Sequence, residues 1–305
     1  MVGMQLNFHT LDVFTTRRFG GNPLGVVLGA DDLTTDQMQT IAREFNLAET
    51  IFVRAPKDPA HTASVRIFFP TDEIPFAGHP TVGCAILLAE MLKGEGKPFE
   101  TQIVLEEVAG LVPVTVRNTG GTSWAQFTAP VVPYPVAADL PSVQDVASAL
   151  GLAPSDVCPG GVPLGLHQGG PRFFYVPVAS TKALARARPQ EPHWSRILNA
   201  LGTVGGYLYA KGGRNPATDY GTRMFNPAGE GTEDPATGSA AALFASQLHQ
   251  TLGLPDGTHA FRLEQGYDMG RPSDIDMEAD VRDGRLMAVR VAGSAVRVMQ
   301  GQLSL

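Results

Sequence analysis

The stretch Phe76–Gly83, FAGHPTVG, decides the fold, because it joins a tight glycine turn to the start of an apolar helix. Proline suits the first position of a helix, so Pro80 predicts a helix start there, with His79 at or next to the N-cap. The residues that follow, Cys84–Leu92, leave almost no polar face, which predicts a helix enclosed on all sides. A glycine beside the free N–H groups of a helix start is suited to binding a carboxylate.

A second stretch, Glu233–Ala240 (EDPATGSA), shows the same order of polar residue, proline, threonine, glycine and apolar helix. Aligning the two stretches places the DP of residues 234–235 on the HP of residues 79–80, and Arg223–Pro227 on Arg66–Pro70. A repeat of this length predicts two copies of a domain-sized unit. We expect the two helix starts to face one cleft that holds an anionic substrate.

Composition bounds the class of protein. The chain has 305 residues, of which 43% are hydrophobic, so about two domains with sizeable cores are expected. A net charge of -7 argues against a nucleic-acid partner. The two cysteines form no CxxC pair, which favours a reduced, cytoplasmic protein. The first residues lack the pattern of a signal peptide and no apolar run reaches membrane length, so neither a signal peptide nor a membrane span is expected. The seven histidines show no ligand spacing, so no metal is expected.

The order of the predicted elements indicates an α+β fold. Short strands surround two apolar helices without the regular strand–helix alternation of a doubly wound sheet. The proline-rich stretch Pro130–Pro135 predicts the boundary between a first lobe, residues 1–129, and a second lobe, residues 130–291. Near the end of the chain, Arg285–Val291 and Ser294–Met299 are expected to form separate strands.

Four side chains are candidates for acid/base or binding chemistry, and most have a structural alternative. Asp234, before a proline, is typical of an N-cap, and Ser239 could serve only as a small residue that permits close helix packing. Glu49, between a helix and a strand, could be a solvated carboxylate. His79 is a mediocre N-cap, and a helix N-terminus disfavours its cationic form, which leaves a neutral imidazole for proton transfer.

Eight segments carry a specific likeness to one family: Leu11–Phe14, Gly21–Leu24, Asn46–Val53, Gly78–Thr81, Glu233–Ala240, Gln265–Gly266, Gly270–Ser273 and Val291–Val296. Through them the chain resembles the PhzF (phenazine-biosynthesis-like) family over nearly its full length. The resemblance implies the diaminopimelate-epimerase-like fold, in which each of two similar lobes wraps a mostly antiparallel sheet or barrel around one central helix. It also implies an active site in the cleft, no cofactor, a homodimer, and a final strand, about residues 292–305, that returns to the first lobe.

The resemblance also implies an activity and its residues. Glu49 takes the place of the family's general acid/base, which shifts a proton from the hydroxyl-bearing carbon of a dihydro-hydroxyanthranilate to another ring position on the same face. The other matched positions are the side chains His79, Asp234 and Ser239, and the glycines Gly78 and Gly238, whose backbone would lie at the substrate. The expected partner is therefore a small cyclic carboxylate.

The cysteines separate this reaction from a related one. Epimerases and racemases of the implied fold use two cysteines, one at each helix start. Here Cys84 lies inside the first helix and Cys158 in a distant loop, so a two-thiol racemase is not expected. Two alternatives to a proton-shift isomerase stay open: a one-base epimerase or other cofactor-free lyase or isomerase, and a non-catalytic protein that binds a small carboxylate.

Overall fold

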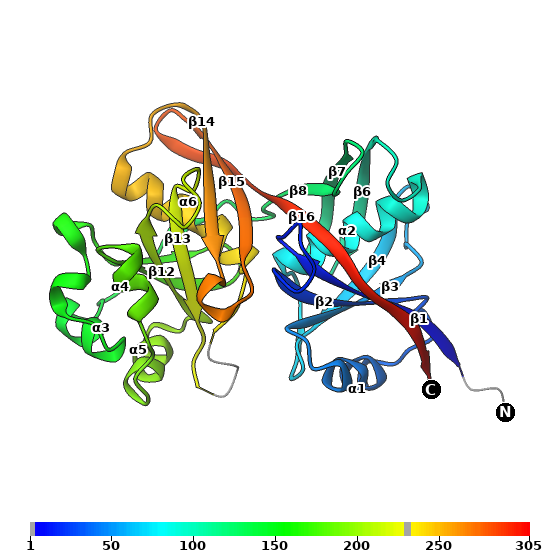
Figure 1. Cartoon of the computed structure of the whole chain (residues 1–305), viewed down its shortest axis with the longest axis horizontal. Coiled ribbons are helices and arrows are strands. Elements are labelled where there is room, and N and C mark those ends of the chain that lie inside the picture. Colours follow the sequence, from blue (N-terminus) through cyan, green and yellow to red (C-terminus); the bar gives the residue numbers. More distant parts are fainter. Residues whose placement is uncertain (1–3, 229–232) are drawn as a thin grey trace. The chain divides into compact units, whose positions relative to one another are not determined.

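The chain folds into two compact units that each surround one long helix. The computed structural model describes residues 4–228 and 233–305. One unit comprises Met1–Pro130 with Ala292–Leu305, and the other comprises Val131–Val291. Their central helices are α2 (Gly78–Lys93) and α6 (Gly238–Leu252) (Figure 1). Strands and helices occur together in both units, so the α+β prediction is confirmed. In the described part of the chain, no helix has the length and apolar character needed to cross a bilayer.

The first unit is a closed barrel with α2 inside. Its elements are β1 (Gln5–Val13), β2 (Asn22–Leu28), α1 (Thr35–Phe45), β3 (Glu49–Arg54), β4 (Ala63–Phe68), β5 (Glu73–Ile74), α2 (Gly78–Lys93), β6 (Phe99–Glu107), β7 (Gly110–Asn118), β8 (Trp124–Thr128) and the second part of β16 (Arg285–Ser304). Neighbouring strands follow the order β1-β2-β3-β4-β6-β7-β8-β16, and β16 pairs with β1. That pairing closes the barrel and leaves neither strand with an unpaired edge.

The second unit carries the same kind of sheet around α6, with smaller helices on its outside. Its elements are β9 (Tyr134–Pro135), α3 (Val143–Ala149), β10 (Gly165–Gln168), β11 (Arg172–Pro177), α4 (Thr181–Arg186), α5 (His193–Leu201), β12 (Gly205–Lys211), β13 (Tyr220–Phe225), α6 (Gly238–Leu252), β14 (Gly257–Gln265), β15 (Ser273–Arg282) and the first part of β16. The strand order is β16-β15-β14-β13-β12-β11-β10-β9.

The direction of each strand pair repeats from one unit to the other. In the first unit β2–β3 and β4–β6 are parallel, with α1 and α2 as the respective connections. In the second unit β11–β12 and β13–β14 are parallel, with α4 and α5 in the first connection and α6 in the second. The flanking pairs β1–β2, β3–β4 and β6–β7 in the first unit, and β12–β13 and β14–β15 in the second, are antiparallel. This shared pattern supports the duplication expected from the sequence.

Helix α2 is buried along almost all of its length, as its apolar sequence predicts. Residues from Gly78 through Leu87 are all buried. A Cβ atom at Gly83 would come within 2.6 Å of Leu24 and 2.7 Å of Val13. Glycine is therefore required for α2 to approach β1 and β2 this closely. This close packing holds α2 against β2, the strand that pairs with β3, which begins at Glu49.

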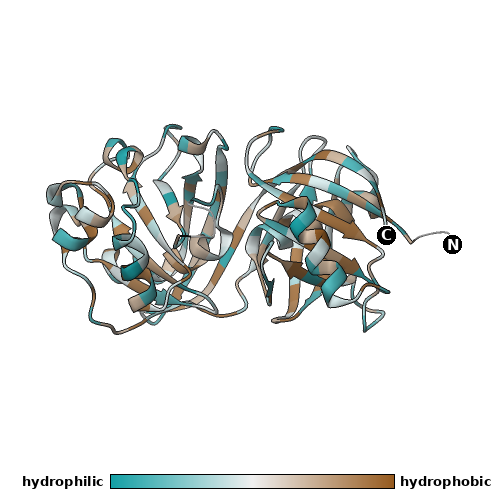
Figure 2. Cartoon of the chain, turned by 90° about the horizontal axis from the view of Figure 1, so that it is seen from below, coloured by the Kyte–Doolittle hydropathy of each residue, from teal (hydrophilic) through white to brown (hydrophobic). Residues whose placement is uncertain are grey.

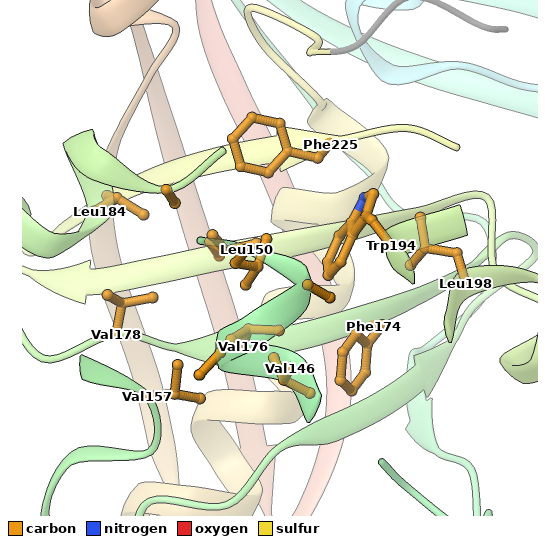
Figure 3. Close-up of a cluster of buried hydrophobic side chains, with 14 of the residues drawn as sticks. Val146, Leu150, Val157, Phe174, Val176, Val178, Leu184, Trp194, Leu198 and Phe225 are labelled. Atoms are coloured by element: carbon orange, nitrogen blue, oxygen red, sulfur yellow. The ribbon is translucent and has the colours of Figure 1, made fainter. Parts of the chain in front are cut away.

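The second unit has an additional core outside its sheet. Figure 3 shows Trp194 of α5 among Phe174, Phe225 and Leu198, with Val146 of α3 and its C-cap residue Leu150 beside the same sheet. Trp194 is fully buried, which indicates a well-filled layer between the small helices and the strands. In both units the ribbons carry brown, hydrophobic segments interrupted by teal, polar ones (Figure 2), as alternation along half-buried strands requires.

The two separate strands expected near the end of the chain form a single continuous strand. β16 runs unbroken from Arg285 to Ser304, and Gly293 lies within it. Its residues from Ala295 to Ser304 pair with β1. Closing the barrel demands an extended chain through the glycine, so this tertiary pairing outweighs the local preference of Gly293 for a break.

Candidate active site

A carboxylate and a histidine meet inside the first unit. Glu49, the first residue of β3, is 8% exposed, and His79, in the first turn of α2, is 3% exposed. His79 Nε2 lies 3.3 Å from Glu49 Oε2. The alternative that Glu49 is a solvated carboxylate is therefore wrong. A buried carboxyl beside a buried imidazole is an arrangement that can hold and transfer a proton.

The protonation of His79 follows from its surroundings. Burial lowers the pKa of His79 to about 3, against a weaker opposing effect from its hydrogen bond to the backbone carbonyl of Pro23. The imidazole is therefore neutral, and the N–H donated to Pro23 leaves Nε2 as the unprotonated nitrogen; it lies near Glu49 but makes no hydrogen bond with a described residue. A hydrogen bond between the two side chains then requires the proton to be on Glu49. The neutral form was predicted, but burial, and not the helix N-terminus, is its main cause.

The start of α2 differs from the prediction. The N-cap is Ala77 and the helix begins at Gly78, so His79 is the second helical residue and Pro80 the third. The first N–H groups of a helix have no intrahelical acceptor, so proline is tolerated at the third position as it is at the first. The same rule leaves the N–H groups of Gly78 and His79 without an acceptor inside the helix.

Asp234 is positioned by a bridge to a strand and by a threonine. Helix α6 begins at Gly238 with Thr237 as N-cap, so the reading of Asp234 as the N-cap is wrong. The backbone N–H of Asp234 instead donates to the Met224 carbonyl at 3.1 Å, which holds the residue in an extended conformation. The Thr237 hydroxyl donates a short hydrogen bond to the Asp234 carboxylate. Ser239 is the second residue of α6 and is half-buried.

Gln265, the last residue of β14, supports this arrangement, although sequence reasoning assigned it no role. Its amide Nε2 donates to the Asp234 carbonyl at 2.8 Å and to the Thr237 hydroxyl at 2.9 Å. Its Oε1 accepts from the Thr237 N–H at 3.1 Å. The dipeptide Gln265-Gly266 belongs to the segments that carry the family resemblance, and that was the available signal. The side chain fixes the Thr237 hydroxyl so that it donates to Asp234.

The structure corrects the register of the internal repeat. Arg66 forms paired hydrogen bonds with Glu73, seven residues later, and Arg223 forms the same pair with Glu233, ten residues later. Each guanidinium also lies over a phenylalanine ring two residues on. Counted from these glutamates, the equivalent positions are Pro75 and Pro235, Gly78 and Gly238, and His79 and Ser239. The alignment of Pro80 with Pro235 is wrong because the second copy has a longer connection before its glutamate.

The two cysteines lie away from the helix starts. Cys84 is buried in α2, and burial raises the pKa of its thiol. Cys158 precedes a short turn with a left-handed backbone, φ 54°. Neither cysteine therefore supplies a thiolate at the helix starts Gly78 and Gly238. This agrees with the expectation that the protein is not a two-thiol racemase.

Other features of the described residues do not coincide with these groups. Two pockets of about 190 and 390 Å³ lie within the second unit, and none of the six predicted site residues lines either. Within residues 4–228 and 233–305, no three His, Cys, Asp or Glu side chains are grouped so that they could hold a metal ion.

Comparison with known proteins establishes the family. A family model described as phenazine biosynthesis-like protein, PhzC-PhzF, matches residues 11–301. The chain belongs to this family. An uncharacterized isomerase from Mesorhizobium japonicum is 40% identical over 300 residues, which cover 97% of this chain and 98% of the relative. The trans-2,3-dihydro-3-hydroxyanthranilate isomerase of Pseudomonas aeruginosa is 32% identical over 303 residues, which cover 96% of this chain and 97% of that enzyme.

A solved structure agrees with the family assignment. The phenazine biosynthesis protein of the PhzF family from Bacillus anthracis superposes with a TM-score of 0.87 at 25% sequence identity, covering 99% of this chain and 100% of that one. Together with the named relatives, this likeness makes the protein an isomerase of the PhzF family.

Proposed function

We propose that the protein catalyses a cofactor-independent proton shift on a small cyclic carboxylate, of the type named by trans-2,3-dihydro-3-hydroxyanthranilate isomerase. The observation that carries the proposal is the buried contact of Glu49 with the neutral imidazole of His79, Oε2 to Nε2 3.3 Å. One acid/base group is sufficient for such a reaction. It takes a proton from one carbon and returns one to another carbon of the same face, so no atom is gained or lost.

Glu49 and His79 divide the work of that step. In its ionised form Glu49 removes the proton from the hydroxyl-bearing carbon, and in its acid form it delivers a proton to a second ring carbon. His79 stays neutral, accepts a hydrogen bond from the acid form of Glu49, and so fixes the direction in which the carboxyl group presents its proton. Its own N–H is committed to Pro23, which holds the tautomer.

The second unit contributes groups suited to binding. Asp234, oriented by Thr237, is assigned to a substrate hydroxyl or amino group or to a proton relay, and Ser239 to a further hydrogen bond. The free N–H groups at Gly78 and Gly238 are suited to the substrate carboxylate. That the two helix starts serve one substrate stays a prediction, as do the homodimer, the absence of a cofactor and the cytoplasmic location.

The test is proton exchange with solvent. In heavy water, the protein is incubated with trans-2,3-dihydro-3-hydroxyanthranilate and with a panel of small cyclic amino and hydroxy acids, and deuterium uptake is followed by mass spectrometry. For a turned-over substrate, Glu49→Gln should lower the uptake rate by about 10²- to 10⁴-fold, because it removes the acid/base group but keeps its size. Substrate binding, measured by calorimetry, should change little.

Glu100→Gln is the matched control, since Glu100 lies in the same unit and its side chain is 65% exposed. It should leave deuterium uptake at the wild-type rate. Unchanged uptake in Glu49→Gln would remove Glu49 from its role. Inversion of a stereocentre, seen by chiral chromatography, would point to the one-base epimerase. Binding of a carboxylate with no exchange for any compound would point to a non-catalytic binding protein.

A further inference from the structure

Glu107 is a buried carboxyl group that the proposed reaction does not use. It is the last residue of β6 and is 8% exposed. Its Oε1 lies 2.7 Å from the hydroxyl of Thr81 in the first turns of α2. Its Oε2 is buried and has no hydrogen-bond partner among the described residues. A carboxylate in such a place would leave a charged oxygen unsolvated, which is costly.

Counting protons around Thr81 shows which hydrogen bond a protonated Glu107 can add. The Thr81 hydroxyl oxygen lies 2.7 Å from the carbonyl of Ala77 and 2.7 Å from Glu107 Oε1. A hydroxyl has one proton, and a carbonyl has none to donate. If Thr81 donates to Ala77, the second contact is a hydrogen bond only when Glu107 donates to Thr81. Burial raises the pKa of Glu107 to about 8, which agrees with a carboxylic acid at neutral pH.

The internal repeat contains a neutral counterpart of this group. Gln265 ends β14 as Glu107 ends β6, and each follows a glutamate, Glu264 or Glu106, that accepts hydrogen bonds from two successive backbone N–H groups of a loop. Gln265 donates to a threonine hydroxyl at the start of α6. A protonated Glu107 donates in the same way to Thr81 at the start of α2. An amide and a carboxylic acid thus each contact a threonine hydroxyl near a helix start, although in the register given above Thr237 corresponds to Ala77 and not to Thr81.

We propose that Glu107 acts as a neutral acid that positions the first turn of α2, and with it His79, and that its ionised form releases this turn. Glu107 is a positioning residue, because it acts through Thr81 and Ala77 and touches no reacting group. The effect on turnover rests on the proposed function of His79, whereas the protonation of Glu107 and the anchoring of the helix start do not depend on it.

The groups around Glu107 do not offer a counter-charge for its ionised form. On α2 the interacting titratable group is the Cys84 thiol, which burial keeps protonated. Glu106 points to the opposite face of β6, where it binds the loop residues Lys57 and Asp58 and the His61 ring. The residue opposite Glu107 on β7 is Gly110. The N-terminus of α2 favours a nearby anion, but burial outweighs that attraction.

The experiment compares Glu107→Gln with Glu107→Met over a range of pH. The glutamine keeps a donor for Thr81, as Gln265 does for Thr237, and the methionine keeps the volume without a donor. With a turned-over substrate, the wild-type kcat should fall about tenfold between pH 7 and pH 9, as expected for loss of one proton with a pKa of about 8. The kcat of Glu107→Gln should fall less than twofold over the same range, and the kcat of Glu107→Met should be low at every pH. An alkaline fall of equal size in Glu107→Gln would overturn the proposal.

Two readouts need no turnover. In protein labelled with ¹³C-glutamate, the carboxyl signal of Glu107 is identified as the one that is absent from Glu107→Gln. This signal should titrate near pH 8. A Glu107 carboxyl group that is already ionised at pH 6 would overturn the proposal. Hydrogen exchange at the Thr81 amide, which donates to Ala77, should accelerate above pH 8 in the wild type relative to Glu107→Gln. An unchanged ratio of the two exchange rates would also overturn it. If no cyclic carboxylate is turned over, the proposed function fails while these two measurements still decide the role of Glu107.

Discussion

At the scale of single residues, the chemistry of the first unit depends on how burial sets the state of two side chains. Burial holds His79 neutral, and the carbonyl of Pro23 selects which ring nitrogen carries the proton. The other nitrogen faces Glu49 at 3.3 Å. A cationic imidazole would bind the ionised form of Glu49 tightly and weaken it as a base. The neutral tautomer whose N–H is donated to Pro23 can hydrogen-bond only the acid form. The pair therefore suits a group that must alternate between base and acid.

The state of His79 has a measurable consequence. With a pKa of about 3, the ring should stay neutral from pH 5 to pH 8, so ¹⁵N NMR should show one protonated and one unprotonated nitrogen throughout. A His79 midpoint near 6.5 would contradict the assignment.

The same shift affects stability with a defined sign. The folded pKa lies below the unfolded value of 6.5, so the unfolded chain takes up the proton first as the pH falls. The stabilisation associated with neutral His79 is complete above pH 6.5 and is lost from there toward pH 3, by about 1.4 kcal/mol per pH unit at most. In His79→Asn, this part of the acid destabilisation should be absent when unfolding by urea is measured from pH 7 to pH 4.

At the scale of elements, a strand end holds a helix start in each unit. β14 ends in Gln265, whose amide holds Thr237 and the Asp234 carbonyl, and β6 ends in Glu107, which contacts Thr81 of α2. The turn after β14 lies close to the same segment: a Cβ atom at Gly266, φ +72°, would come within 2.5 Å of the Pro235 carbonyl. In each unit these contacts hold residues near the start of the central helix.

The hydroxyl of Thr237 is the link that can be tested. Thr237→Val removes the donor to Asp234 and the acceptor for Gln265 but keeps the shape of the side chain. The free energy of unfolding should fall by about 1–3 kcal/mol, because partners are left unsatisfied. The rate of proton exchange should fall by about tenfold or more if Asp234 acts in the reaction. Thr237→Ser, which keeps the hydroxyl, is the control and should retain the wild-type rate, whereas equal behaviour of the two variants would show that the hydroxyl is irrelevant.

At the scale of the whole molecule, β16 is the strand on which the first unit depends. It leaves the second unit at residue 291 and then supplies the last strand of the barrel, which pairs with β1 from Gln5 to Val13. Without it, β1 and β8 would have unpaired edges and the core around α2 would be open to water.

Truncation measures that dependence. A chain that ends at Val291 should lose the cooperative unfolding of the first unit and should aggregate, which circular dichroism and size-exclusion chromatography can follow. A chain that ends at Gln300 loses the partners of Gln5 to Phe8 but keeps those of His9 to Val13, and is the matched control. Wild-type folding of the shorter chain would show that the final strand is not needed to close the barrel.

Much of the fold was accessible from the sequence, because it depends on patterns that are local in the chain. The two apolar helices were predicted and are observed as α2 and α6. The helix starts were wrong by a few residues, because Pro80 and Asp234 follow local rules that the contacts of Ala77 and Thr237 override. The repeat register failed for a similar reason, since the connection lengths differ between copies.

The sequence by itself determined that the chain has two related units around two buried helices, and which residue types stand near their starts. Periodicity and composition are local properties, and they are sufficient for that. Only the tertiary structure decided that Glu49 is buried against His79 and that burial keeps the His79 ring neutral. It also decided that Glu107 and Gln265, at the ends of β6 and β14, contact the starts of helices that precede those strands in the chain. Those facts depend on which side chains exclude water from one another, and residues far apart in the chain settle that only when the barrel is closed.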